Sequence, residues 1–265
     1  MQLLHNGMIA KDTIPRPGAP ALEKGLDLIE ALAAESRGLS QTQIAERVGR
    51  SVSEIFRMLG VLEERGYVSR DAMTGEYTLT LQLFRIAAQF PPTKRLQRAA
   101  LPAMEILTSQ TGLSCHLTVL NNQQFMVVAQ MDPEWQMGWS VRLGAIFPLT
   151  LEYASAKVLA AFQLENRRAE LAAVIARHDR CPIKNVLAEL SKVVARGGDF
   201  PKEGQAPRLR AFSCPVFETS GRAIAALTVP LMRQEKMQAA EATEIEENLR
   251  TAARQISEKV GAVGT

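Results

Sequence analysis

Two serines, each followed by a short amphipathic stretch, constrain the fold of this chain most strongly. Ser40 is followed three positions later by Gln43, the spacing of a capping box that satisfies the first free N–H groups of a helix. Ser51 or Ser53 can cap a second stretch in the same way. Apolar residues recur at helical spacing after each cap, namely Ile44, Ala45 and Val48, then Ile55, Met58, Leu59 and Leu62. Since Gly49 and Gly66 then end the two stretches, the pattern predicts two short helices joined by a tight turn.

A further helix precedes this pair, and a hairpin follows it. From Ala21 onward, apolar residues recur at spacings of 4, 3 and 4 until Ser36 and Gly38 end the pattern. Residues 67–79 contain two short β-prone runs that flank Thr74-Gly75, which indicates a hairpin turn. Helices joined by a tight turn and followed by a hairpin predict a winged helix-turn-helix domain over residues 21–80.

This arrangement is typical of DNA-binding domains, because an α-helix fits the major groove and polar side chains on its first turns can reach base edges. Polar residues cluster on the outer face of the predicted third helix, and these are Ser51, Ser53, Glu54 and Arg57. The alternative interpretation is a small helical domain that binds other proteins.

The net charge of +3 hides a basic segment between two less basic parts. Residues 1–80 carry nine Lys/Arg and eleven Asp/Glu, whereas residues 81–98 carry four basic residues and no acidic one. Because Pro91-Pro92 interrupts the helical pattern there, we interpret 81–98 as a helical linker between two domains. A solvated helix face would have the same composition. Residues 1–20 hold three prolines and little apolar periodicity, so we expect a flexible tail.

Residues 99–265 contain hairpin and helix patterns in alternation, which predicts an α+β domain with an antiparallel sheet. Helical spacing runs from Leu96 to Ser109, and Gly112 ends it. Strands are predicted at 115–120, 125–130, 139–143, 210–217 and 222–230, and further helices at 153–162, 169–176, 186–195 and 236–259.

The chain resembles the IclR family of bacterial transcriptional regulators over about residues 20–260. In the first domain the resembling residues are Leu39-Ser40, Ile44-Ala45, Gly49, Ser53, Ile55, Arg57-Met58-Leu59, Leu62, Gly66-Tyr67-Val68, Gly75 and Tyr77. In the second they are Gly144, Pro148-Leu149, Ala154-Ser155, Leu159-Ala160, Pro215-Val216-Phe217, Gly221 and Ala225-Ala226-Leu227. The resemblance implies a GAF-like second domain that binds a small effector and helps to form dimers and tetramers.

Roles in DNA binding follow partly from this resemblance and partly from side-chain chemistry. Arg57 matches the family's arginine and is expected to bind a phosphate or a guanine edge. The family's Pro-Lys-Ser-Thr run corresponds to 51–54, where Val52 replaces the lysine and Glu54 a hydroxyl. Glu54 can accept from a cytosine amino group or offset the charge of Arg57. The other candidates are Ser51 and Ser53 for backbone or base, Ser40, Gln41 and Thr42 for phosphate, and Arg70 and Thr74 for wing contacts.

A loop that leads into a helix offers free backbone N–H groups at the positive end of the helix dipole, which suits a carboxylate of a small metabolite. Such a loop precedes the helix predicted at 153–162. The candidate effector residues are Glu152, Tyr153, Ala154 and Ser155 at this loop, with His116, Cys214 and Thr228 on neighbouring strands. Taken singly, the last three also fit ordinary structural roles, Cys214 as a small buried apolar residue.

No constellation of residues points to catalysis or to a cofactor. The three histidines are dispersed, and no nucleophile elbow, P-loop or dinucleotide fingerprint is present. His178 and Cys181 lack a second ligand pair, so we expect no metal site. Three widely spaced cysteines fit a reducing compartment. No long apolar run or signal peptide is evident, so we expect a cytoplasmic protein without membrane contact.

We therefore expect a regulator of transcription and not an enzyme. It would bind double-stranded DNA at a roughly palindromic operator as a homodimer or homotetramer. A small-molecule effector, expected to be an organic acid, would modulate the binding, and repression is the more frequent mode in the family. The alternatives are a ligand-sensing enzyme built on the second domain and an adaptor whose winged domain contacts a partner protein.

Overall fold

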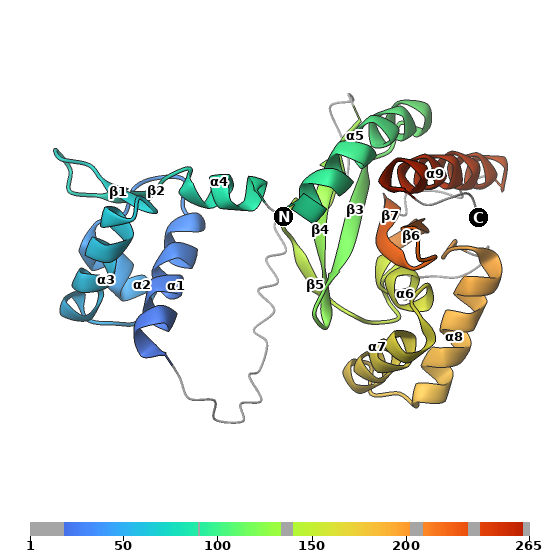
Figure 1. Ribbon diagram of the computed structural model, residues 1–265, viewed down its shortest axis with the longest axis horizontal. Coiled ribbons are helices and arrows are strands. Elements are labelled where there is room, and N and C mark those ends of the chain that lie inside the picture. Colours follow the sequence, from blue (N-terminus) through green and yellow to red (C-terminus); the bar gives the residue numbers. More distant parts are fainter. Residues whose placement is uncertain (1–18, 90, 134–139, 202–208, 233–238, 262–265) are drawn as a thin grey trace. The chain divides into compact units, whose positions relative to one another are not determined.

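The computed structural model describes residues 19–89, 91–133, 140–201, 209–232 and 239–261. The chain divides into two compact units, Met1–Phe90 and Pro91–Thr265 (Figure 1). The tail predicted for residues 1–20 lies almost entirely outside the described residues. No helix in the described ranges combines the length and the apolar character that crossing a bilayer requires.

The first unit has the predicted order of elements. Its helices are α1 (Pro20–Ala33), α2 (Gln41–Arg47), α3 (Val52–Glu64) and α4 (Gln82–Ala88), and the strands β1 (Val68–Arg70) and β2 (Tyr77–Leu79) form the antiparallel hairpin. One core joins these elements, and its fully buried members include Leu28, Ile44, Ile55 and Leu59. The periodic apolar positions thus fold α1 to α3 and the hairpin into one winged helix-turn-helix body.

Capping side chains define where α2 and α3 begin. The capping box of Ser40 and Gln43 is confirmed, and of the two candidates before α3 it is Ser51 that caps, with Glu54 as its partner. Gly49 has a φ of +64°, a left-handed conformation that a residue with a side chain rarely adopts, and it ends α2. The turn between the two helices is therefore set by local chemistry at both ends.

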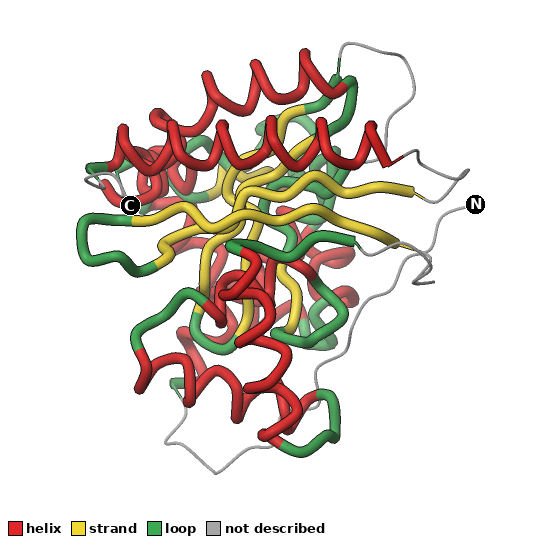
Figure 2. Tube along the Cα trace, turned by 90° about the vertical axis from the view of Figure 1, so that its right-hand side faces the viewer, coloured by secondary structure: helices red, strands yellow, loops and turns green. Residues whose placement is uncertain are grey.

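The second unit is built on a five-stranded antiparallel sheet with the order β5-β4-β3-β7-β6. Its strands are β3 (Cys115–Asn121), β4 (Gln124–Met131), β5 (Ile146–Pro148), β6 (Leu209–Phe217) and β7 (Ala223–Met232). One face carries α5 (Pro91–Thr111) and α9 (Ala239–Val260), and the other carries α6 (Ala154–Ala161), α7 (Glu165–His178) and α8 (Ile183–Arg196) (Figures 1 and 2).

Each face of the sheet has its own hydrophobic core. Leu117, Leu227 and Leu249 lie in the core between the sheet and α5 and α9, and Phe125, Ala226 and Leu159 lie in the core toward α6, α7 and α8. Because helices cover both faces of the sheet, strand residues that point toward α5 and α9 differ little in polarity from those that point toward α6, α7 and α8. Only residues that point toward α6 can contribute to a site on that side.

Two expectations from the sequence differ from the structure. The strand predicted at 139–143 is wrong for residues 140–143, which form no strand, and β5 lies beyond Gly144. Pro91-Pro92 does separate two helices, since α4 ends at Ala88 and Pro91 begins α5, but residues 91–98 lie in α5 of the second unit. Residues of 91–98 also pack on the second unit: Leu96 is buried in its core and the Arg95 guanidinium donates to the Val260 carbonyl at 2.9 Å.

Candidate DNA interface and effector site

The exposed face of α3 carries one cation without an internal partner. Arg57 is exposed and makes no hydrogen bond or ion pair with any residue that the structure describes. Ser53, one turn before it, is also exposed and shares a hydrogen bond only with Ser51, with 3.2 Å between the two hydroxyl oxygens. Both side chains are free to contact an external ligand such as a phosphate or a base edge.

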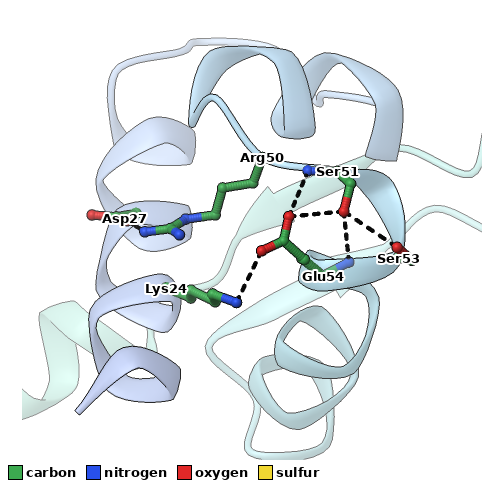
Figure 3. A network of polar contacts seen from close by, with 6 residues as sticks. All are labelled: Lys24, Asp27, Arg50, Ser51, Ser53 and Glu54. Carbon is green, nitrogen blue, oxygen red and sulfur yellow. Dashed lines mark hydrogen bonds and ion pairs between the residues drawn. The ribbon is translucent and has the colours of Figure 1, made fainter. Parts of the chain in front are cut away.

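Glu54 is also exposed, but its carboxylate has partners within the domain (Figure 3). Its carboxylate accepts hydrogen bonds from the Ser51 backbone N–H at 3.0 Å and from the Ser51 hydroxyl at 2.8 Å, and it pairs with the Lys24 ammonium of α1 at 3.1 Å. The hydrogen bonds from Ser51, then Lys24, lower the pKa of Glu54 from 4.5 to about 2. The charge that Glu54 offsets is therefore that of Lys24, and the alternative that it offsets Arg57 is wrong.

A second ion pair ties α1 to the same end of α3. The Arg50 guanidinium, directly before the cap of α3, lies 2.8 Å from the Asp27 carboxylate, and Asp27 lies one turn after Lys24 on α1 (Figure 3). All four side chains are partly exposed, so each pair contributes little stability alone. Together the two pairs orient the start of α3 relative to α1. The sequence analysis did not single out Lys24, Asp27 or Arg50, although the opposite charges of Lys24 and Asp27, three positions apart on α1, were a visible signal.

The remaining DNA candidates lie at the start of α2 and on the hairpin. Ser40 accepts from the Gln43 N–H as a cap, Thr42 is exposed, and the side-chain nitrogen of Gln41 is buried without a described partner. On the hairpin, the Arg70 guanidinium lies 5.5 Å from the centre of the Tyr77 ring, and the Thr74 hydroxyl accepts from the Glu76 N–H. All of these residues belong to the same unit as α3, and among them the side chains of Thr42 and Arg70 are exposed to solvent.

A row of buried polar side chains crosses the sheet on its α6 side. His116 on β3 pairs in register with Thr228 on β7, and Thr228 pairs with Ser213 on β6. The Thr228 hydroxyl lies 2.8 Å from that of Ser213 and 2.9 Å from that of Ser155 on α6. All four side chains are buried, so the structure brings three predicted effector residues together and adds Ser213.

His116 is the one member of this row with an unsatisfied atom. Its Nδ1 is buried without a hydrogen-bond partner in the described part of the chain. Burial lowers the pKa of His116 from 6.5 to about 4, so the imidazole is neutral at physiological pH. The row therefore offers hydroxyl groups and an uncharged ring nitrogen, and an unpartnered buried nitrogen is costly unless a ligand satisfies it.

The loop before α6 contributes an aromatic neighbour to this region. Tyr153 occupies the N-cap position of α6, and its ring lies 5.8 Å from that of Phe125 and 5.5 Å from that of Phe147. Burial and the nearby charge of Glu152 raise the pKa of Tyr153. Ala154 is buried in the first turn of α6, whereas Glu152 is exposed. The backbone N–H groups of Leu151 and Glu152 in this loop are already used, since they donate to Asp179 and Thr150, so the loop contributes mainly apolar surface.

Cys214 is not part of this group. Strand alternation turns Ser213 toward α6 and Cys214 toward the core shared with α5 and α9, where burial raises the pKa of its thiol to about 12. The expectation that Cys214 completes the wall with Thr228 is therefore wrong, because the two lie on opposite faces. Among the described residues, no three histidine, cysteine or acidic side chains gather as metal ligands would.

Comparison with known proteins covers both units. Residues 21–72 match the IclR helix-turn-helix domain, and residues 93–258 match the C-terminal domain of bacterial IclR transcriptional regulators. The chain is 28% identical over 253 residues to the HTH-type transcriptional regulator KdgR of Escherichia coli, which covers 90% of this chain and 91% of KdgR.

Two solved structures share the fold. Pseudomonas aeruginosa HmgR is 29% identical, with a TM-score of 0.69 over 93% of this chain and 100% of HmgR. An IclR homologue from Microbacterium hydrocarbonoxydans, crystallised with 4-hydroxybenzoate, is 18% identical, with a TM-score of 0.72 over 91% of this chain and 98% of that one. Together with the two domain matches, the winged unit and the two-sided sheet show that this chain belongs to the IclR family of bacterial transcriptional regulators, proteins that combine a DNA-binding domain with an effector domain.

Proposed function

We propose that this regulator binds a roughly palindromic operator as a homo-oligomer and that a small organic acid modulates the binding, with repression as its mode. The proposal that this chain reads DNA rests on two properties of α3, its fixed start and its exposed outer face. Its start is joined to α1 by two ion pairs, while Arg57 and Ser53 remain exposed on its outer face, Arg57 without a described partner and Ser53 bonded only to Ser51. The family membership supplies the biological context for this geometry.

The charge of residues 1–80 supports the proposal of a homo-oligomer. Residues 1–80 have a net charge of −2, so no broad basic surface supplies the affinity for DNA. A few contacts from Arg57, Arg70 and Thr42 must be repeated on a second half-site to bind tightly. We accordingly propose a dimer or tetramer on a palindromic site, in the cytoplasm where the chromosome lies.

An organic acid fits the buried row on the α6 side. The hydroxyls of Ser155 and Thr228 and the free Nδ1 of His116 can hydrogen-bond a carboxylate or hydroxyl group, and the start of α6 adds backbone N–H groups and a positive dipole. Tyr153 lies at the same helix start and would contact the apolar part of the ligand. The complex of the Microbacterium homologue with 4-hydroxybenzoate supports a ligand of this class.

The effector would act through the basic linker at 81–98, which spans the junction between the units at Phe90 and Pro91. With residues 21–80 as the reading domain and 99–265 as the sensor, a ligand shifts the population between arrangements that fit the operator and those that do not. Such a shift requires that the ligand bind the two arrangements with unequal affinity.

A gel-shift titration with the DNA upstream of the protein's own gene tests the proposal. We expect salt-sensitive binding that survives competitor DNA, and loss of that binding in Arg57→Ala with the oligomer intact by size exclusion. Arg65→Ala, at the exposed C-terminal end of the same helix, is the matched control and should bind as the wild type does. Wild-type affinity in Arg57→Ala would contradict the assignment of α3, and absence of binding at low salt would contradict the function.

A further inference from the structure

Two exposed apolar side chains on α3 have no role in the DNA contacts proposed above. Val52 is 40% exposed and Phe56 is 59% exposed. The core side of the same helix is filled by Ile55 and Leu59, which are fully buried, so Val52 and Phe56 are not needed for packing. An exposed phenylalanine on the helix proposed to read DNA is available to contact the ligand of that helix.

Val52 and Phe56 lie next to the side chains on α3 that are proposed to contact DNA. They lie four residues apart, and therefore on one side of the helix, in its first two turns. Each directly precedes a proposed DNA contact, Ser53 and Arg57 respectively. The first turns of a recognition helix are the part that reaches base edges in helix-turn-helix proteins. The capping box and the Lys24 pair fix the orientation of this end.

The chemistry of the major groove selects the target. Guanine and adenine present hydrogen-bonding groups at their major-groove edges and cytosine an amino group beside a small C5–H, whereas thymine alone carries a C5-methyl group. An apolar side chain placed against the other edges would cover polar groups without satisfying them. We propose that Val52 and Phe56 recognise the C5-methyl groups of thymines in each half-site of the operator, an inference that rests on the proposed function and adds a base preference to it.

The helix also supplies a matched control. Val61 is 49% exposed, comparable with Val52 and Phe56, but it lies one and a half turns beyond Phe56 and about 140° away around the helix axis. A general effect of exposed apolar surface on solubility or folding would appear equally in Val61→Ala. An effect through thymine would appear only in variants of Val52 and Phe56.

The test uses the full chain and a chemically defined probe. A duplex is selected from random-sequence DNA by wild-type protein, and each thymine of its half-sites is then replaced in turn by deoxyuridine, which lacks only the C5-methyl group. At one or two positions per half-site we expect affinity to fall about fourfold for each methyl group removed, the value of one buried methyl-sized group. Phe56→Ala should bind the thymine duplex more weakly than wild type and lose sensitivity at its position.

Phe56→Leu keeps an apolar side chain and should retain the sensitivity, whereas Val61→Ala should behave as wild type at every position. Wild-type protein that is indifferent to deoxyuridine at all positions would overturn the inference while leaving the regulator proposal intact. So would Phe56→Ala and Val52→Ala variants that remain as sensitive as wild type. If the wild type enriches no duplex at all, the proposed function itself is overturned and this inference with it.

Discussion

Gln43 and Glu54 hold equivalent positions, each three residues after the serine that caps its helix, and comparison of the two separates capping from charge. Both side chains accept the backbone N–H of their capping serine. Only Glu54 adds a negative charge, and that charge pairs with Lys24. A carboxylate also stabilises the positive end of a helix. At α3 one side chain therefore caps the helix, complements its dipole and fixes it to α1.

The neutral state of His116 makes the stability of the second unit depend on pH. Burial lowers the pKa of its imidazole from 6.5 to about 4, so the unfolded chain takes up a proton at a higher pH than the folded chain does. The stabilising contribution is complete above pH 6.5 and is lost as the pH falls from 6.5 toward 4. We expect the free energy of unfolding to fall by about 3 kcal/mol more in wild type than in His116→Gln across that window.

Urea unfolding followed by near-UV circular dichroism at several pH values from 7.5 to 4.5 measures this difference. His178→Gln is the comparison variant, since His178 is half-exposed and its Nδ1 lies 2.9 Å from an Asp179 carboxylate oxygen. It should keep the loss of stability that burial of His116 causes. A His116→Gln variant whose stability falls in parallel with that of wild type would mean that the imidazole is already protonated or solvated in the folded protein.

At the scale of elements, Arg250 joins three segments of the second unit. From α9 its guanidinium donates to the carbonyl of Arg196 at the end of α8, at 2.6 Å, and pairs with Glu246 at 2.7 Å. It also lies 4.4 Å from the centre of the Phe200 ring, which packs in the core beside β6. The contact therefore satisfies a helix-end carbonyl and holds α8 against α9.

We expect Arg250→Ala to destabilise the second unit by about 1 kcal/mol, which discounts the charged hydrogen bonds for the exposure of the side chain. The melting temperature should fall by roughly 2–4 °C. Hydrogen exchange should become faster at the C-terminal turn of α8. Arg254→Ala, one turn later on α9, exposed and without a hydrogen bond or ion pair to any described residue, should change neither quantity. Equal effects of the two variants would show that only charge or helix propensity matters.

The elements that local chemistry determines were predictable from the sequence. The capped starts of α2 and α3 and the turn at Gly75 each depend on residues within four positions, and the structure has all three. β5 was not, because its three residues form a strand only through pairing with β4. The alternating pattern of 139–143 fits a strand locally, but residues 140–143 form no strand in the structure.

The effector residues show a second limit. Strands β6 and β7 were predicted, but not the direction of their side chains, because helices cover both faces of the sheet and both sets of positions are apolar or small. Ser213 and Cys214 could therefore not be distinguished from sequence. What distinguishes Ser213 is its hydrogen bond to the Thr228 hydroxyl, which lies 15 residues away from Ser213 in the sequence.

For the whole molecule, the distribution of charge decides how DNA can be bound. The total of +3 combines −2 over residues 1–80, +4 over residues 81–98 and +1 over residues 99–265. Two of the arginines in 81–98 have internal hydrogen-bond partners, since Arg95 donates to the Val260 carbonyl and Arg85 to the Gln82 side chain. Under the function proposed above, affinity comes from the simultaneous use of two reading domains, and the geometry between half-sites becomes as important as the bases.

We therefore expect binding to depend on the rotational setting of the half-sites. Inserting about 5 bp between the half-sites of a selected operator turns one of them to the opposite side of the duplex, where a dimer cannot reach both. Affinity should fall by about 10²-fold or more, because the second contact is no longer intramolecular. Inserting about 10 bp returns the second half-site to the original side of the duplex and should recover part of the affinity.

Gel shifts with the three duplexes measure these affinities, and Arg57→Ala should bind none of the duplexes. Equal affinity for all three would mean that each reading domain binds independently, and the charge distribution would then need another source of affinity.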